Sequence, residues 1–225
     1  MREAPPTSER LSEEKERALE AVRSRIEDVT DRLGKPIEEG IREAVVLLNV
    51  LDIATQQSCE GHEDESDGLP FPWIDIAAPG RPRERYVGQA NVYEETAQAH
   101  GIPVERLWNP ETDVDERAAE EALQRVEEND ETAAYAAWRR VNDDLLARGR
   151  LLVEEFNAIH SSTTKPTLRV APLAESARLF SGPIEYPRGG TIPQEDQEAL
   201  VTELPHSRAE MRAFADFLKQ KFSES

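Results

Sequence analysis

Apolar residues recur at intervals of three and four near the start of the chain, between Ser12 and about Leu33. This spacing gathers them on one face of a helix. The residues on that face are Leu19, Val22, Ile26, Val29 and Leu33. Pro36 then suits the first turn of a second helix over 37–51. Because the segment AVVLLNVL is apolar almost all round, we expect this second helix to be buried.

The hydrophobic period shortens after the second helix, which predicts strands. Four segments have this character, and the first two flank the loop EGHEDESDGLPFP. They are 53–57, 73–77, 167–173 and 176–181. Helical spacing returns between and after these strands. The further predicted helices cover about 92–100, 116–129, 131–160 and 207–222.

Together these elements predict an α+β protein that is mostly helical and has a small sheet of about four strands. The sheet would carry the loop from Cys59 to His62. We expect residues 12–225 to form a single α+β domain with a helix-rich insertion at about 90–160. Residues 1–11 contain two prolines among polar residues, so we expect a disordered N-terminus there.

The charge balance restricts the functional classes. The chain has 46 acidic and 27 basic residues, with a net charge of −19. Broad nucleic-acid binding is not expected, because phosphate contacts need clustered Lys and Arg. Binding to an anionic membrane surface is disfavoured for the same reason. A single cysteine cannot form an intramolecular disulfide, and we find no signal peptide or membrane-length apolar run. An acidic, cytoplasmic protein is therefore predicted.

The only cysteine lies in the string TQQSCEGH, beside a glutamate, a glycine and a histidine. Cys59 and His62 have the Cys-x-x-His spacing of half a zinc site, but a structural site needs further ligands. The acidic run 63–68 resembles the start of a calcium loop, yet Ile74 stands where the twelfth-position glutamate belongs. Metal binding is thus one hypothesis, and the sequence identifies neither a metal nor any other cofactor.

A catalytic hypothesis uses the same residues. His62 would be the base that activates the Cys59 thiol, and Glu60 would orient the imidazole or act as a general acid and base. The alternative is structural: Cys59 would be a small buried residue, and His62 a loop side chain with satisfied hydrogen bonds. The predicted catalytic residues are therefore Cys59, Glu60 and His62.

Further residues are predicted to bind a ligand beside this loop. Arginine is costly to bury without a partner, so we expect Arg169 or Arg178 to pair with Glu60 or Asp75. An arginine, a glutamate and a histidine beside a thiol would suit a small anionic ligand. The predicted ligand-binding residues are Thr55, Ser58, Gly61, Trp73, Asp75, Arg169 and Arg178.

The strings TQQSCEGH, PFPWIDI and ARLFSGP, with the closing MRAFADFLKQKF, resemble a family of uncharacterised bacterial proteins. Its members carry a strand, an S-C-E-G-H loop, a P-W-[IV]-[DE]-[IV] strand and a C-terminal helix. The resemblance covers about 37–77 and 167–222. The family has no assigned activity, so the resemblance implies a site at the loop and no reaction. A weaker likeness is to a tRNA wyosine-modifying family, whose loop ends in Arg where this chain has His62.

Two functional classes follow from these observations. In the first, the chain is a small-ligand or metal-binding protein that uses the S-C-E-G-H loop, with catalysis left open. In the second, it is an acidic helical module that binds a partner protein, and the loop is structural. The classes differ in whether Cys59, Glu60 and His62 converge on an accessible site or point into a sealed core.

Overall fold

The computed structural model describes most of the chain. The described residues are 8–30, 34–63, 69–160, 168–182 and 194–224. The chain divides into two compact units. The first comprises Met1–Ala78 and Asp144–Ser225, and the second comprises Pro79–Asp143.

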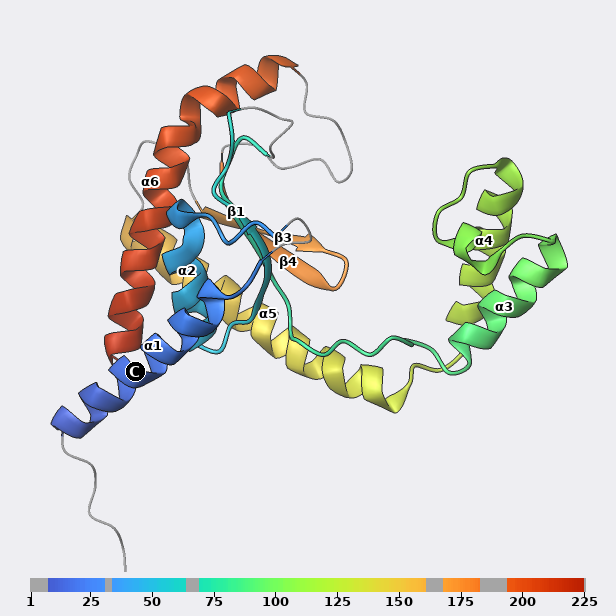
Figure 1. The fold of residues 1–225 in the computed structure, drawn as a ribbon, viewed down its shortest axis with the longest axis horizontal. Coiled ribbons are helices and arrows are strands. Elements are labelled where there is room, and N and C mark those ends of the chain that lie inside the picture. Colours follow the sequence, from blue (N-terminus) through green and yellow to red (C-terminus); the bar gives the residue numbers. More distant parts are fainter. Residues whose placement is uncertain (1–7, 31–33, 64–68, 161–167, 183–193, 225) are drawn as a thin grey trace, which may run out of the picture. The chain divides into compact units, whose positions relative to one another are not determined.

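The first unit is built around an antiparallel sheet of four strands (Figure 1). The strands are β1 (Thr55–Cys59), β2 (Trp73–Ile76), β3 (Leu168–Leu173) and β4 (Ser176–Ser181). They lie in the order β1-β2-β4-β3, and every neighbouring pair is antiparallel. The predicted α+β class is confirmed, as is the prediction that these four strands share one sheet.

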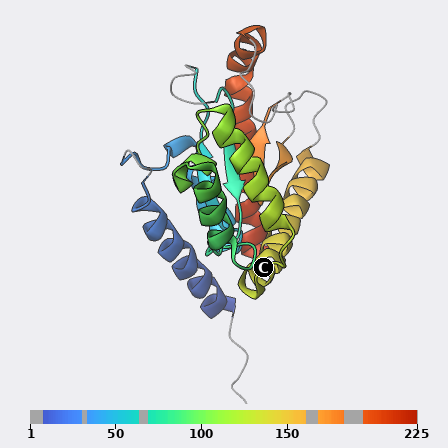
Figure 2. The ribbon, with the colours of Figure 1, turned by 90° about the vertical axis from the view of Figure 1, so that its right-hand side faces the viewer.

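Helices α1, α2, α5 and α6 surround this sheet or pack beside it. Their bounds are Ser8–Glu27, Glu39–Val50, Ala133–His160 and Gln194–Glu224, and α5 begins in the second unit. Helix α6 packs against α2 and β4, and Figures 1 and 2 both show it running alongside the sheet. Phe156 of α5 packs edge-on against Phe214 of α6, with ring centroids 5.3 Å apart.

Helix α2 is buried, as its apolar sequence predicts. Its buried residues are Ile41, Ala44, Val45, Val46, Leu47 and Leu48. Ile74, Ile76 and Leu179 of the sheet are fully buried as well. Gly149 of α5 lies so close to the sheet that a Cβ there would stand 2.5 Å from Cδ1 of Ile76. The core of this unit therefore lies between the sheet and its helices.

Several predicted boundaries differ from the structure. Helix α1 ends at Glu27, not near Leu33, because Thr30 already forms an antiparallel bridge with Pro36. It begins at Ser8, so the last residues of the segment predicted to be disordered are helical, and residues 1–7 lie outside the described part. Helix α6 begins at Gln194, well before the predicted start at residue 207.

Helix α6 contains Pro205, which removes one backbone hydrogen bond. The N-terminal part of α6 is inclined to the rest in Figure 1, as expected for a helix with an internal proline. Leu200, which precedes Pro205 in α6, packs with Phe71 and Phe180 in a small apolar cluster. The bend therefore lets one helix contact both the core and the end of the sheet near Cys59.

The second unit is helical. Its elements are α3 (Gln89–His100), the short 3-10 helix η1 (Val104–Leu107), α4 (Asp113–Glu127) and the start of α5. Thr112 and Asp115 form a capping box at the start of α4. Its buried cluster consists of Tyr93, Ala97, Leu107, Ala118, Ala122 and Val126. This unit overlaps the predicted insertion at about 90–160, and the prediction of a single domain stays a prediction.

The first residue of β3 is held by side chains from two helices. Oε1 of Glu210 accepts a hydrogen bond from the Leu168 N–H at 3.1 Å, and Nδ2 of Asn157 donates to the Leu168 carbonyl at 2.8 Å. Burial raises the pKa of the Glu210 carboxyl, whereas the Leu168 amide, the Ser181 hydroxyl and His160 lower this pKa. The net shift is upward, so the fold favours the protonated form.

We expect Glu210→Gln to melt at a higher temperature than the wild type at pH 7, by roughly 2 °C. A raised folded-state pKa gives stability that is present below the unfolded pKa and is lost as pH rises through the folded pKa. Glutamine keeps the acceptor for Leu168 and cannot ionise, so the difference should shrink towards pH 4. Melts of both proteins across this range measure it, with Glu198→Gln on the exposed face of α6 as the control. A wild type that melts several degrees above Glu210→Gln at pH 7 contradicts the prediction.

Candidate metal centre

Cys59 is the last residue of β1, so the predicted strand 53–57 is shifted towards the loop. It lies directly opposite Trp73 of β2 in the antiparallel register. Its side chain is buried, with 6% of the residue exposed. A strand rather than a mobile loop therefore fixes the position of the thiol.

Gly61 turns the chain sharply after Cys59. Its φ is +82°, in the left-handed region that favours glycine. A Cβ at this position would stand 2.7 Å from the carbonyl carbon of Phe71 and 2.7 Å from Cδ1 of Leu204. After the turn, the His62 N–H donates to the Leu69 carbonyl at 2.9 Å. The turn thus directs the side chains of Cys59 and His62 towards each other.

The third member of the group is Glu38, which the sequence analysis did not select. It is the N-cap residue of α2, but its side chain makes no capping hydrogen bond. Its Oε1 lies 2.8 Å from Nε2 of His62, and its Oε2 accepts the Glu60 N–H at 2.6 Å. In the sequence, Glu38 is one of two glutamates at a helix start, where acidic residues are common. No local signal distinguishes it, because its partners Glu60 and His62 lie more than 20 residues away in the sequence.

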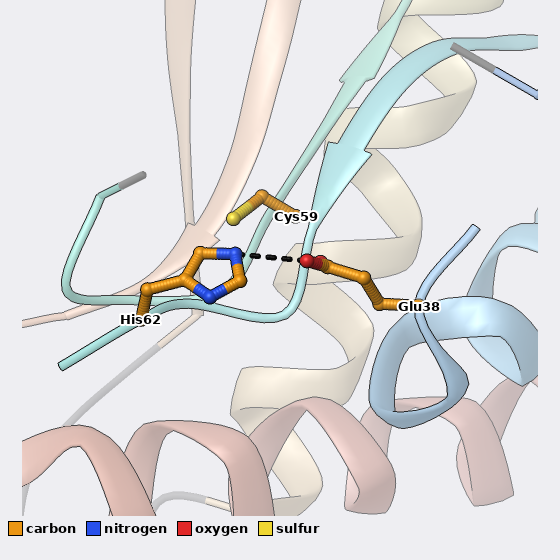
Figure 3. A group of neighbouring side chains, drawn as sticks. All are labelled: Glu38, Cys59 and His62. Atoms are coloured by element: carbon orange, nitrogen blue, oxygen red, sulfur yellow. Dashed lines mark ion pairs between the residues drawn. The ribbon is translucent and has the colours of Figure 1, made fainter. Parts of the chain in front are cut away.

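A sulfur, a nitrogen and an oxygen converge at this point. One ligand atom each from Glu38, Cys59 and His62 lies within 4.8 Å of the other two. Figure 3 shows that the imidazole nitrogen paired with Glu38 is also the one nearer to Cys59, while the other ring nitrogen points away from both. Exposed fractions of 23% for the His62 side chain and 32% for that of Glu38 leave the group reachable from solvent.

The Cys59 thiol is in an environment that disfavours its charged form. Burial raises its pKa, and the carboxylates of Glu38 and Glu60 raise it further. Hydrogen bonds from the backbone of Gly61 and Leu69 oppose the shift, and the Gly61 N–H lies 3.3 Å from Sγ. Without a nearby cation, the group is therefore a neutral thiol at neutral pH.

Glu60, predicted to be catalytic, lies next to this group and points elsewhere. Its Oε2 accepts the Gly40 N–H at 2.8 Å, and its Oε1 lies 3.5 Å from the guanidinium of Arg208. Arg208 also donates to the carbonyls of Glu60 and Gly61, at 3.1 and 2.6 Å. The carboxylate beside the His62 imidazole is therefore that of Glu38 and not that of Glu60, which the sequence had suggested.

The predicted ion pair between a strand arginine and an acidic residue is confirmed. Arg178 of β4 donates two hydrogen bonds to the carboxylate of Asp75, at 2.7 and 2.8 Å. Its guanidinium also lies 3.8 Å from the ring centroid of Trp73. Both charged side chains are more than four-fifths buried. Asp75 and Arg178 are thus partners within the sheet.

The other predicted ligand-binding residues are spread over the sheet. Thr55 lies at the start of β1, where its hydroxyl accepts a hydrogen bond from Asn49 at 2.9 Å. Ser58 pairs with Ile74 across the strands, so its side chain leaves the sheet on the face opposite to that of Cys59. Arg169 lies on β3, which forms the opposite edge of the sheet from β1, so the two strands are about 14 Å apart. None of these three belongs to the Glu38–Cys59–His62 group.

No protein-family model, curated protein or solved structure matches this chain. The resemblance to the S-C-E-G-H family therefore stays a prediction. In the part of the chain that the structure describes, no helix is both long enough and apolar enough to cross a membrane.

We expect Gly61→Ala to destabilise the protein by about 2–4 kcal/mol, since it combines an unfavourable φ with a clash against backbone atoms. For a chain of this size that corresponds to a fall in melting temperature of roughly 4–16 °C. Gly34→Ala is the matched control, because Gly34 has a φ of +76° and no atom of the described residues lies within 4 Å of its Cβ position. The two variants should differ by the cost of the clash alone. Equal melting temperatures would show that the space around Gly61 is not limiting.

Proposed function

We propose that this chain binds a divalent transition metal through Glu38, Cys59 and His62, and that zinc suits the site best. The observation that carries the proposal is the convergence of the three ligand atoms within 4.8 Å. Thiolate and imidazole ligands favour zinc and related metals over calcium and magnesium, which prefer oxygen. A carboxylate completes a set of three different ligands, all of which zinc accepts.

The orientation of the imidazole favours a metal site over a catalytic triad. In a triad, one ring nitrogen faces the nucleophile and the other faces the carboxylate that orients the ring. Here Nε2 faces both Cys59 and Glu38 (Figure 3). A single cation near Nε2 could contact all three groups, whereas proton transfer from the thiol through the ring to Glu38 has no path. The raised pKa of the Cys59 thiol also opposes a free thiolate nucleophile.

The surrounding hydrogen bonds fit a bound metal. The Gly61 N–H points at Sγ of Cys59, where it would stabilise a thiolate ligand. The Glu60 N–H holds Oε2 of Glu38, which leaves Oε1 for the metal. Ligands held by such outer hydrogen bonds need little rearrangement when the ion binds.

Three protein ligands would leave a fourth position on a tetrahedral zinc ion. Zinc sites of this kind keep water or substrate there, and the pKa of the bound water falls to about 7. The partly exposed side chains of Glu38 and His62 keep this position within reach of solvent. A small anionic ligand, the class expected from the sequence, would bind at that position. Hydrolytic chemistry is the class of reaction that such a position supports.

Zinc titration tests the proposal. We expect the metal-free wild type to bind one zinc ion per chain, measured by calorimetry and by metal analysis after dialysis. Cys59→Ser, His62→Ala and Glu38→Gln should each lower the affinity at least about 100-fold, because each removes a ligand. Zinc at 100 times its Kd should stabilise the wild type by about 2.7 kcal/mol and leave Cys59→Ser almost unchanged.

Glu39→Gln is the matched control, since Glu39 neighbours Glu38 at the exposed start of α2. It should bind zinc as the wild type does. A wild type that takes up no zinc, cobalt or other divalent transition metal would sink the proposal. In that case, a large loss of stability in His62→Ala would favour the structural role of the loop and the partner-binding class.

A further inference from the structure

The loop after β1 and the start of α2 hold each other through two reciprocal hydrogen bonds. The carboxylate of Glu38 accepts the backbone N–H of Glu60 at 2.6 Å. In return, the carboxylate of Glu60 accepts the backbone N–H of Gly40 at 2.8 Å. Each segment thus supplies one acid and one amide to the other. We call this pair of contacts the Glu38–Glu60 clasp.

Glycine at position 40 leaves room for this clasp. It lies within the first turn of α2, and its φ is not in the left-handed region. Alanine is a better helix former than glycine, so the helix itself gives no reason for glycine here. A Cβ at residue 40, however, would stand 2.5 Å from Oε2 of Glu60. The Glu60 carboxylate therefore occupies the space that a side chain at position 40 would fill.

Arg208 holds the same loop from the other side. Its guanidinium donates to the carbonyls of Glu60 and Gly61 and lies 3.5 Å from Oε1 of Glu60. The two carboxylate oxygens of Glu60 therefore face different elements, with Oε2 on α2 and Oε1 on α6. Glu60 is therefore held at both its backbone and its side chain.

We propose that Glu60 is a positioning residue for the metal site, which acts by holding the start of α2 so that Glu38 reaches the ion. This inference rests on the proposed metal-binding function. Glu60 is not itself a ligand, because its carboxylate faces Gly40 and Arg208. Its effect passes through the Gly40 amide to the helix start and so to Glu38. Outer-shell groups of this kind typically change metal affinity 10- to 100-fold.

Three variants separate this role from a general structural one. Glu60→Ala removes the acceptor for the Gly40 N–H. Gly40→Ala displaces the Glu60 carboxylate and at the same time improves the helix propensity of residue 40. Glu60→Gln keeps an acceptor oxygen and removes the charge. We expect zinc affinity, measured by competition with a chromophoric chelator, to fall 10- to 100-fold in the first two and less than about threefold in Glu60→Gln.

The metal environment provides a readout that a structural role would not change. With cobalt in place of zinc, the thiolate-to-cobalt absorption should persist in all three variants, because Cys59 remains a ligand. The bands that report coordination geometry should change in Glu60→Ala and Gly40→Ala and stay as in the wild type for Glu60→Gln. Thermal melts of the metal-free proteins measure the stability cost of each variant separately from its metal affinity. If Gly40→Ala fails to fold, the comparison of Glu60→Ala with Glu60→Gln decides alone.

Two control variants match the substitutions. Glu43→Ala removes a partly exposed glutamate of α2 that pairs with Arg23. Gly182→Ala adds a Cβ whose nearest neighbour among the described residues, an atom of the Phe71 side chain, lies 3.8 Å away. Both should bind zinc as the wild type does.

The positioning role of Glu60 is overturned if Glu60→Ala and Gly40→Ala bind zinc with wild-type affinity. If Cys59→Ser loses binding in the same experiment, the proposed metal site itself is supported. Equal losses in Glu60→Ala and Glu60→Gln also overturn the positioning role. A wild type that binds no metal overturns both proposals.

Discussion

The space around Gly61 constrains the geometry of the whole candidate site. Backbone atoms of Phe71 and the side chain of Leu204 occupy the place where a Cβ would stand. The chain can turn there only with a residue that lacks a side chain and tolerates a positive φ. Because of this turn, Cys59 and His62 face one point although only two residues separate them. Leu204 belongs to α6, so the packing of the C-terminal helix and the shape of the loop depend on each other.

The Asp75–Arg178 pair belongs to the sheet rather than to this site. Arg178 lies two strands from β1, about 10 Å across the sheet. It makes two short hydrogen bonds to Asp75 and stacks on Trp73, so its charge is compensated without a ligand. Losing one partner of such a buried pair costs much more than losing an exposed ion pair, because the other charge stays buried. A structural role therefore accounts for these two residues, and their predicted role in ligand binding stays a prediction.

The sequence predicted much of the fold because its signals are local. The apolar face of α2 and the four strands follow from hydrophobic period, and turn residues mark their ends. The start of α6 was missed because the segment before residue 207 has a proline and no clear apolar stripe; tertiary contacts such as that of Leu200 accompany its helical form. Glu38 was missed for a related reason. Its role depends on contacts with Glu60 and His62, and pattern analysis of one sequence does not report such contacts.

The charges around Cys59 also support the proposal that a cation binds between Glu38, Cys59 and His62. Two carboxylates, those of Glu38 and Glu60, act on a buried thiol and raise its pKa. Arg208 compensates Glu60, and the imidazole of His62 is the described partner of Oε1 of Glu38. Ionising the thiol would add a second negative charge beside Glu38, in a place where burial already disfavours charge. A divalent ion would change this balance, because Glu38, Cys59 and His62 would hold it with a carboxylate, a thiolate and an imidazole, and its charge would stabilise both anionic ligands. The same three side chains therefore form a poor nucleophile, and their ligand atoms and charges support the proposed metal site.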